Sequence, residues 1–284
     1  MGVFVVSAIR RSLIRLVGRT PQGSCVILYY HSIPPDQRAA FARQLDLLLH
    51  HAKPIAVSGK VMLTSGIHNV GITFDDALEN FFENAAPELR TRRIPATVFV
   101  VSEAIGKVFG SPGCLEKVMS LQQLRELPEE LVTLGSHTAT HPFLPAMNRE
   151  DARQEFIKSR TQLEEILGRK VLLFSFPFGG FTEELVELCR EAGYQTVFTT
   201  LPYLAFKIPD EFVVGRIRVD PTDWPLEYRL KLAGAYRWLP WAFALKKTIL
   251  SNAVIRKIFS LKGRLAGAPA PQAIIQESQD WKQI

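Results

Sequence analysis

Short apolar runs alternate with longer amphipathic stretches along most of the chain. The run 70–74 is continuously apolar in character, as is typical of a strand buried on both faces, whereas 37–50 repeats its apolar residues at helical spacing. Strands are predicted at 26–30, 70–74, 96–101, 131–134, 171–176, 195–199 and 212–219. Helices are predicted at 37–50, 58–63, 81–89, 121–127, 150–167, 183–192 and from 226 to about 261, with a break at Pro240. This alternation favours a parallel α/β fold, and α/β barrels of 284 residues are common as single domains.

Polar clusters stand where the predicted strands end. His31 follows the first strand, Asp75 and Asp76 follow the second, and His137 and His141 follow the fourth. In a parallel β/α barrel the active site lies at the C-terminal ends of the strands. We therefore expect these five side chains to face one site.

The adjacent carboxylates Asp75 and Asp76 have two interpretations. Two carboxylates facing one cavity repel each other, and a divalent cation bound to one of them removes the conflict. The alternative is a helix N-cap with an acid in the first turn, which Glu79 and the following helix would fit.

The two imidazoles of His137 and His141 favour the metal interpretation. Together with a remote carboxylate, H-x-x-x-H matches a catalytic His₂-carboxylate site that leaves positions open for water and substrate. Serine and threonine around the pair are suited to fixing the rings. Pro142 disfavours helical geometry at His141, so we expect a single turn rather than a continuous helix.

The other histidines are less informative. His31 ends a strand that should be central, and is either a hydrogen-bonded core residue or a general acid. We assign His50 and His51, on a helix end, and His68, in a loop, to structural roles.

Several motifs together carry a resemblance to a known family. They are Thr73-Phe74-Asp75-Asp76, His137 to Pro142, and Phe176-Pro177-Phe178-Gly179. In this order they resemble the first three motifs of the polysaccharide deacetylase family, the NodB-homology domains of the carbohydrate esterase family 4 type. The early stretch 28–33, with Tyr30-His31, is similar to the branch that includes poly-N-acetylglucosamine deacetylases. The resemblance covers roughly residues 25–220.

The resemblance implies a distorted (β/α) TIM-like barrel that removes N-acetyl groups from an N-acetylated sugar or polysaccharide with a divalent metal. By position, Asp76, His137 and His141 would bind the metal. Asp75 would be the base that takes a proton from the attacking water, and His31 the acid that protonates the leaving amine. Zinc is the metal expected from such ligands, with cobalt or nickel as alternatives.

Two residues depart from the family pattern. Ala77 stands where members usually have glycine after the aspartate pair, and Ser175 stands where they have an arginine that orients the base. Our hypothesis is that Arg216, at the end of a later strand, replaces that arginine and keeps Asp75 ionised; the alternative is a surface arginine. The stretch Asp220-x-x-Asp223-Trp224 is spelled like the fourth motif, although its usual arginine partner is missing at Ser175.

Two further groups would contact the substrate. The backbone N–H of Phe178, in the Pro-Phe-Gly turn, would hold the tetrahedral oxyanion. Trp224 would stack against a sugar. Two other functions stay open: a C–N hydrolase of the same superfold acting on a small cyclic amide, and an inactive membrane-associated scaffold of a glycan-synthesis complex.

Charge is concentrated at the two ends of the chain. Residues 1–20 contribute +4 and residues 225–265 contribute +8, against a total of +6, so the body of the chain is acidic. We divide the chain into a basic segment at 1–24, the barrel at 25–224, a basic, aromatic helical extension at 225–265 and a flexible tail at 266–284.

The basic ends allow peripheral contact with an anionic membrane. The alternative is that the basic residues of 225–265 form the solvent-exposed face of a helix that covers the barrel. No signal peptide or transmembrane segment is expected, so we predict a cytoplasmic protein, with peripheral attachment to the inner face of the membrane as the sharper hypothesis. No motif that reads a nucleic-acid groove is present.

Cys25, Cys114 and Cys189 match no zinc or disulfide spacing, and buried free thiols suit a reducing compartment.

Overall fold

A computed structural model describes residues 23–57, 61–111, 114–208 and 210–239. The elements below all belong to one compact unit, Gly2–Tyr236. Within the described ranges, no helix combines the length and the apolar character that crossing a membrane requires.

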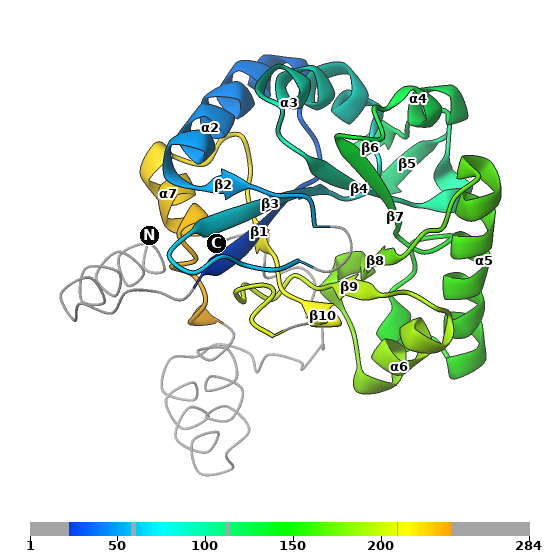
Figure 1. Cartoon of the computed structure of the whole chain (residues 1–284). Helices are drawn as coiled ribbons and strands as arrows, with labels where there is room; N and C mark the ends of the chain where they lie inside the picture. The colour runs from blue at the N-terminus through cyan, green and yellow to red at the C-terminus, as the bar shows by residue number, and fades with distance from the viewer. Residues whose placement is uncertain (1–22, 58–60, 112–113, 209, 240–284) are drawn as a thin grey trace, which may run out of the picture. The chain divides into compact units, whose positions relative to one another are not determined.

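A curled parallel sheet forms the centre of this unit (Figure 1). Its strands are β1 (Ser24–Tyr30), β2 (Lys53–Pro54), β3 (His68–Phe74), β4 (Ala96–Val100), β7 (Val132–Ser136), β8 (Leu173–Ser175), β9 (Thr196–Phe198), β10 (Val213–Val214) and β11 (Ile217–Arg218). The order is β10-β9-β8-β7-β4-β3-β1-β11, with β2 beside β3, and every pairing in this sheet is parallel. The predicted distorted β/α barrel is confirmed.

The predicted strand 212–219 is two strands, and the single-strand prediction is wrong. β10 pairs with β9 at one end of the sheet and β11 pairs with β1 at the other. Only two residues separate β10 from β11, so the two ends of the sheet must lie close together. Between Val214 and Ile217 the chain passes from pairing with β9 to pairing with β1. Arg216 lies at this junction between β10 and β11.

The helices cover the outside of the sheet (Figure 1). They are α2 (Arg38–His51), the π-helix η2 (Phe81–Ala85) running into α3 (Ala86–Arg92), α4 (Leu121–Glu126), α5 (Arg149–Leu167), α6 (Glu183–Glu191) and α7 (Pro225–Leu232). Asn148 and Thr182 cap α5 and α6 through side-chain oxygens that accept backbone N–H bonds. Apolar faces of these helices and of the strands form the core, which includes Phe41, Phe156 and Leu188.

Two helix predictions need correction. The helix predicted from 226 to about 261 ends at Leu232, because Gly234 follows with φ 63°, outside helical space. Residues beyond 239 lie outside the described ranges. Of the short helix predicted at 58–63, residues 61–63 are not helical and 58–60 are not described.

An antiparallel hairpin outside the main sheet was not predicted. It pairs β5 (Val108–Ser111) with β6 (Cys114–Lys117). The hairpin is joined to the segment after β3 by a bridge between Leu78 and Val118. It therefore lies against the chain that carries the aspartate pair.

Cys25 and Cys189 are buried free thiols, as expected; the side chain of Cys114 lies outside the described set. His68 is not in a loop but begins β3, where Nδ1 lies 2.8 Å from the Ser24 hydroxyl and Nε2 lies 2.7 Å from the Leu232 carbonyl. Its role is structural.

Candidate metal and catalytic site

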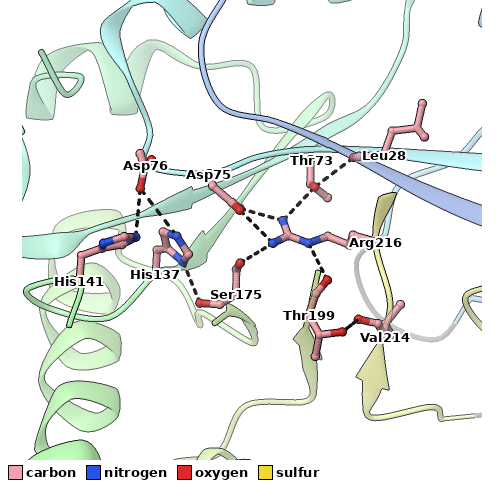
Figure 2. Close-up of polar contacts among 10 residues, drawn as sticks. All are labelled: Leu28, Thr73, Asp75, Asp76, His137, His141, Ser175, Thr199, Val214 and Arg216. Carbon is pink, nitrogen blue, oxygen red and sulfur yellow. Dashed lines mark hydrogen bonds and ion pairs between the residues drawn. The ribbon is translucent and has the colours of Figure 1, made fainter. Parts of the chain in front are cut away.

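The chain turns sharply as soon as β3 ends. The N–H of Asp75 donates to the Tyr30 carbonyl at 3.0 Å, which extends the pairing of β1 and β3 by one step. Asp76 and Ala77 then adopt φ values of 68° and 53°. These left-handed conformations explain why glycine suits position 77, and they direct the carboxylates of Asp75 and Asp76 to different partners (Figure 2).

Neither aspartate caps a helix. The helix that follows has Asn80 as its N-cap, and Asp75 bonds to Arg216 instead. The N-cap interpretation of the pair is therefore wrong.

Asp76, His137 and His141 converge on one point (Figure 2). Asp76 Oδ1 lies 3.7 Å from His137 Nε2 and 3.5 Å from His141 Nε2, and one ligand atom from each residue lies within 4.8 Å of the others. Asp76 Oδ1 is buried and has no hydrogen-bond partner among the described residues. A buried, unpaired carboxylate oxygen that faces two imidazole nitrogens fits a divalent cation.

The turn between the histidines is built to present both rings. Thr138 and His141 both have positive φ values, 68° and 63°, and the His141 N–H donates to Thr138 Oγ1 at 2.9 Å. Glu155 of α5 accepts the N–H groups of Ala139 and Thr140 at 2.8 and 3.0 Å. Non-glycine residues in this region cost about 1–3 kcal/mol each and cluster at functional sites.

Both histidines are held in the form that binds metal. His137 Nδ1 lies 2.7 Å from the Ser175 carbonyl, so Nδ1 carries the proton and Nε2 keeps its lone pair. Burial lowers the pKa of His137, and it lowers the pKa of His141 to about 3, with His137 contributing. The rings are therefore neutral at physiological pH.

The pKa of Asp76 is shifted upward, whereas those of the two histidines are shifted downward. Burial, followed by the charges of Asp75 and Glu116, raises the pKa of Asp76 to about 7. A cation bound at this carboxylate would favour its ionised form. Protons and metal therefore compete for Asp76 near neutral pH.

Arg216 holds Asp75 through two parallel hydrogen bonds (Figure 2). Its Nη1 donates to Oδ1 at 2.7 Å and its Nη2 to Oδ2 at 2.9 Å. The guanidinium also donates to Thr73 Oγ1 and Ser175 Oγ at 3.1 and 2.7 Å, and its Nε to the Thr199 carbonyl at 3.4 Å. The guanidinium thus reaches the short side chain of Ser175 from the junction between β10 and β11.

The Arg216 guanidinium is fully buried and stacks over aromatic rings. Its central carbon lies 4.6 Å from the Tyr29 ring centroid and 5.3 Å from that of Phe99. Burial would raise the pKa of Asp75, but Arg216, with His137 and His31, holds it well below its usual range. The surface-arginine alternative is wrong, and the expected contact between Arg216 and Asp75 is present.

His31 lies beside the aspartate pair. Tyr30 pairs with Phe74, so His31 and Asp75 leave their strands at neighbouring positions. Desolvation by the surrounding protein lowers the pKa of His31 below its ordinary value, and the charge of Asp75 acts in the opposite direction. Because the side chain is exposed to solvent, water in contact with the ring limits this shift.

Phe178 occupies a strained turn beside His141. It lies in η5 (Pro177–Gly179) with φ 58°, and its ring centroid is 4.6 Å from that of His141. The side chain is 55% exposed, so a ligand can reach it.

Asp220 and Asp223, in the stretch that resembles a fourth motif, make hydrogen bonds outside the Arg216 cluster. Asp223 accepts from Lys231 Nζ at 2.8 Å and from the Asp220 N–H at 3.1 Å. Neither acid is among the hydrogen-bond partners of Arg216. Trp224 precedes α7 and is 73% exposed.

Two acids near the site were not predicted. Glu155 supports the turn between the histidines, and Glu116 of β6 acts on the pKa of Asp76. No motif marks either residue, and in the sequence each resembles a solvated surface charge.

Comparison with known proteins supports the resemblance. The polysaccharide deacetylase family model matches residues 64–197. The chain is 27% identical over 161 residues to a poly-beta-1,6-N-acetyl-D-glucosamine N-deacetylase of Staphylococcus epidermidis, covering 53% of this chain and 54% of that protein. It is 23% identical over 142 residues to the peptidoglycan-N-acetylmuramic acid deacetylase PdaA of Bacillus subtilis, covering 49% of each. The chain thus spans about half the length of these curated relatives.

A solved structure is similar over more of the chain. The structure of IcaB from Ammonifex degensii has a TM-score of 0.65 and 26% sequence identity, and the match covers 75% of this chain and 97% of that one. The chain therefore resembles the polysaccharide deacetylase family in sequence, in fold and in the order of its site residues.

Proposed function

We propose that this protein is a divalent-metal-dependent hydrolase that removes N-acetyl groups from an N-acetylated glycan, with poly-N-acetylglucosamine as the substrate class. The observation that carries the proposal is the convergence of Asp76, His137 and His141 beside an aspartate held by Arg216. The relative named as a poly-beta-1,6-N-acetyl-D-glucosamine N-deacetylase supports this glycan class.

Asp76, His137 and His141 would hold the cation, and zinc suits this ligand set best, with cobalt or nickel as alternatives. A divalent cation bound there supplies Lewis acidity, which polarises an amide carbonyl and lowers the pKa of water.

Asp75 takes the proton of the attacking water. It is ionised at neutral pH because Arg216 holds its pKa low. Both its oxygens are bonded to Arg216, but each keeps a second lone pair that can accept a proton. Arg216 therefore positions the base without blocking it.

His31 returns a proton to the leaving nitrogen. Because its pKa lies below the ordinary value, His31 is mostly neutral at rest and must gain its proton during the reaction. Asp75 has the lower pKa of the two, so passing a proton from Asp75 to His31 is favourable. The amine then leaves with that proton as the C–N bond breaks.

The roles of Phe178 and Trp224 stay predictions. The backbone N–H of Phe178 would donate to the developing oxyanion, and its position beside His141 supports this. The exposed Trp224 would contact a sugar further along the glycan.

The proposal is tested by acetate release from N-acetylglucosamine oligomers. Zinc-loaded Asp75→Asn and His31→Gln should each lose about 10²-fold or more in kcat, because each removes one proton-transfer group. His50→Gln, a histidine at the end of α2, is the matched control and should keep wild-type activity. Acetate release by Asp75→Asn at the wild-type rate would contradict the proposal.

A further inference from the structure

The backbone that carries His31 is not held by the sheet. Tyr30 is the last residue of β1 paired with β3, and Pro34 and Pro35 follow shortly after. Proline lacks an N–H, so this segment cannot form a regular ladder. Other contacts must fix the position of the His31 ring.

A group of polar side chains supplies those contacts. Ser32 Oγ donates to Glu116 Oε1 at 2.7 Å, and Asn80 Nδ2 donates to the same Glu116 oxygen at 2.7 Å and to Ser32 Oγ at 2.8 Å. The N–H of Ile33 donates to Asn80 Oδ1 at 3.0 Å, and the carbonyl of Ile33 accepts from Asn84 Nδ2 at 2.9 Å. The hydroxyl of Ser32 and both backbone groups of Ile33, the two residues after His31, are thus hydrogen-bonded to other segments.

The asparagines come from the segment that follows the metal ligand. Asn80 is the N-cap of the π-helical turn η2 and Asn84 lies within it, and such a distortion is common at functional sites. This segment ties the His31 turn to the chain of Asp75 and Asp76.

Glu116 belongs to the β5–β6 hairpin, which is tied to the same segment. The N–H of Met119 donates to the Ala77 carbonyl at 2.9 Å, and Leu78 and Val118 form an antiparallel bridge. The hydrogen-bond donors to Glu116 within the described ranges are the neutral side chains of Ser32 and Asn80. Hydrogen bonds to a carboxylate are roughly twice as strong as neutral ones, which suits a fixed contact.

We propose that Glu116 is a positioning residue: through Ser32 and Asn80 it holds the turn that carries His31, and so aligns the acid with the leaving nitrogen. The hairpin then has a function in the reaction that its place outside the main sheet does not suggest. The catalytic part of this inference depends on the deacetylase proposed above, whereas the effect on His31 does not.

Two variants of Glu116 test the inference. Glu116→Ala removes the shared acceptor, and kcat should fall about tenfold while KM changes less than about twofold, because the acid is misplaced but the substrate is still bound. Glu116→Gln keeps an oxygen that accepts both hydrogen bonds, and should stay within about threefold of wild type. Ser32→Ala, which removes one donor and leaves the hairpin intact, should lower kcat in the same way as Glu116→Ala.

Lys117→Ala is the matched control, because it alters the same strand and removes only a contact with Glu79. Its kcat should equal that of wild type. All variants should retain the wild-type zinc content. A loss of zinc from Glu116→Ala, or an equal fall in kcat in Lys117→Ala, would overturn the inference.

A second measurement needs no substrate. The chain has six histidines, and the imidazole NMR signal of His31 is the one that is missing from the spectrum of His31→Gln. Glu116→Ala should shift or broaden the His31 signal and leave those of His50 and His51 in place, whereas Glu116→Gln and Lys117→Ala should change none. An unchanged His31 signal in Glu116→Ala would overturn the inference. Failure of the wild type to release acetate would instead refute the proposed function and leave this result valid.

Discussion

Replacement of Arg216 by methionine should destabilise the fold, and more strongly at neutral than at acidic pH. Arg216 is fully buried, and the side chain of Asp75 is only 4% exposed. Methionine fills much of the volume but supplies no hydrogen-bond donor. The variant therefore leaves a buried carboxylate without its partner.

The expected loss at pH 7 is about 3–5 kcal/mol in the free energy of unfolding, the range for removing one member of a buried ion pair. In the wild type, Asp75 has a folded pKa below its unfolded value, so its stabilising contribution is present above pH ~4 and is lost as pH falls through the folded pKa. In the variant, burial instead raises the folded pKa of Asp75. Its destabilisation then grows as pH rises above ~4, by up to about 1.4 kcal/mol per pH unit.

Denaturant unfolding at pH 4 and pH 7 measures this difference. Arg149→Met is a control at an exposed arginine, and should leave the unfolding midpoint unchanged. The double variant Asp75→Asn with Arg216→Met should recover part of the stability, because no unpaired charge remains. A loss below about 1 kcal/mol at pH 7, or the same loss at both pH values, would refute the reasoning.

Three further predictions concern metal, backbone and membrane. Because Asp76 has a pKa of about 7, zinc affinity should fall about tenfold per pH unit below pH 7, and a flat profile between pH 5.5 and about 7 in chelator competition would contradict this. Gly179→Ala should destabilise by about 1–3 kcal/mol in thermal unfolding, because a Cβ there would lie 1.9 Å from Thr200 Oγ1. Gly168→Ala, with a similar positive φ but open space, should lose only about 1 kcal/mol, and an equal loss in both would remove the steric argument. If the basic ends bind membranes, the chain should sediment with anionic liposomes at low salt and be released at high salt, and no sedimentation at low salt would end that hypothesis.

Much of the sheet could be predicted because its strands carry local signals. The apolar run that ends at Phe74 is a strand, and the polar residues after it reach the site. The split of 212–219 could not be read locally, because it results from the closing of the sheet between β9 and β1. Apolar periodicity does not report which strands a segment pairs with.

The site was predicted in part for the same reason. The motifs predicted the residues around Asp76, and serine in place of arginine at position 175 indicated that Arg216 takes over the contact with Asp75. Glu116 could not be predicted, because its importance depends on a hairpin brought against Ser32 by tertiary contacts. A side chain marked in the sequence only by its charge can be given a role only from its tertiary contacts.

Metal content measured together with acetate release tests the central claim most directly. Asp76→Ala should retain little zinc after dialysis and release no acetate from N-acetylglucosamine oligomers, whereas Asp36→Ala, at an exposed aspartate in η1 (Pro35–Gln37), should match the wild type in both. Equal zinc content in Asp76→Ala and the wild type would contradict the assignment of Asp76, His137 and His141 as the metal site.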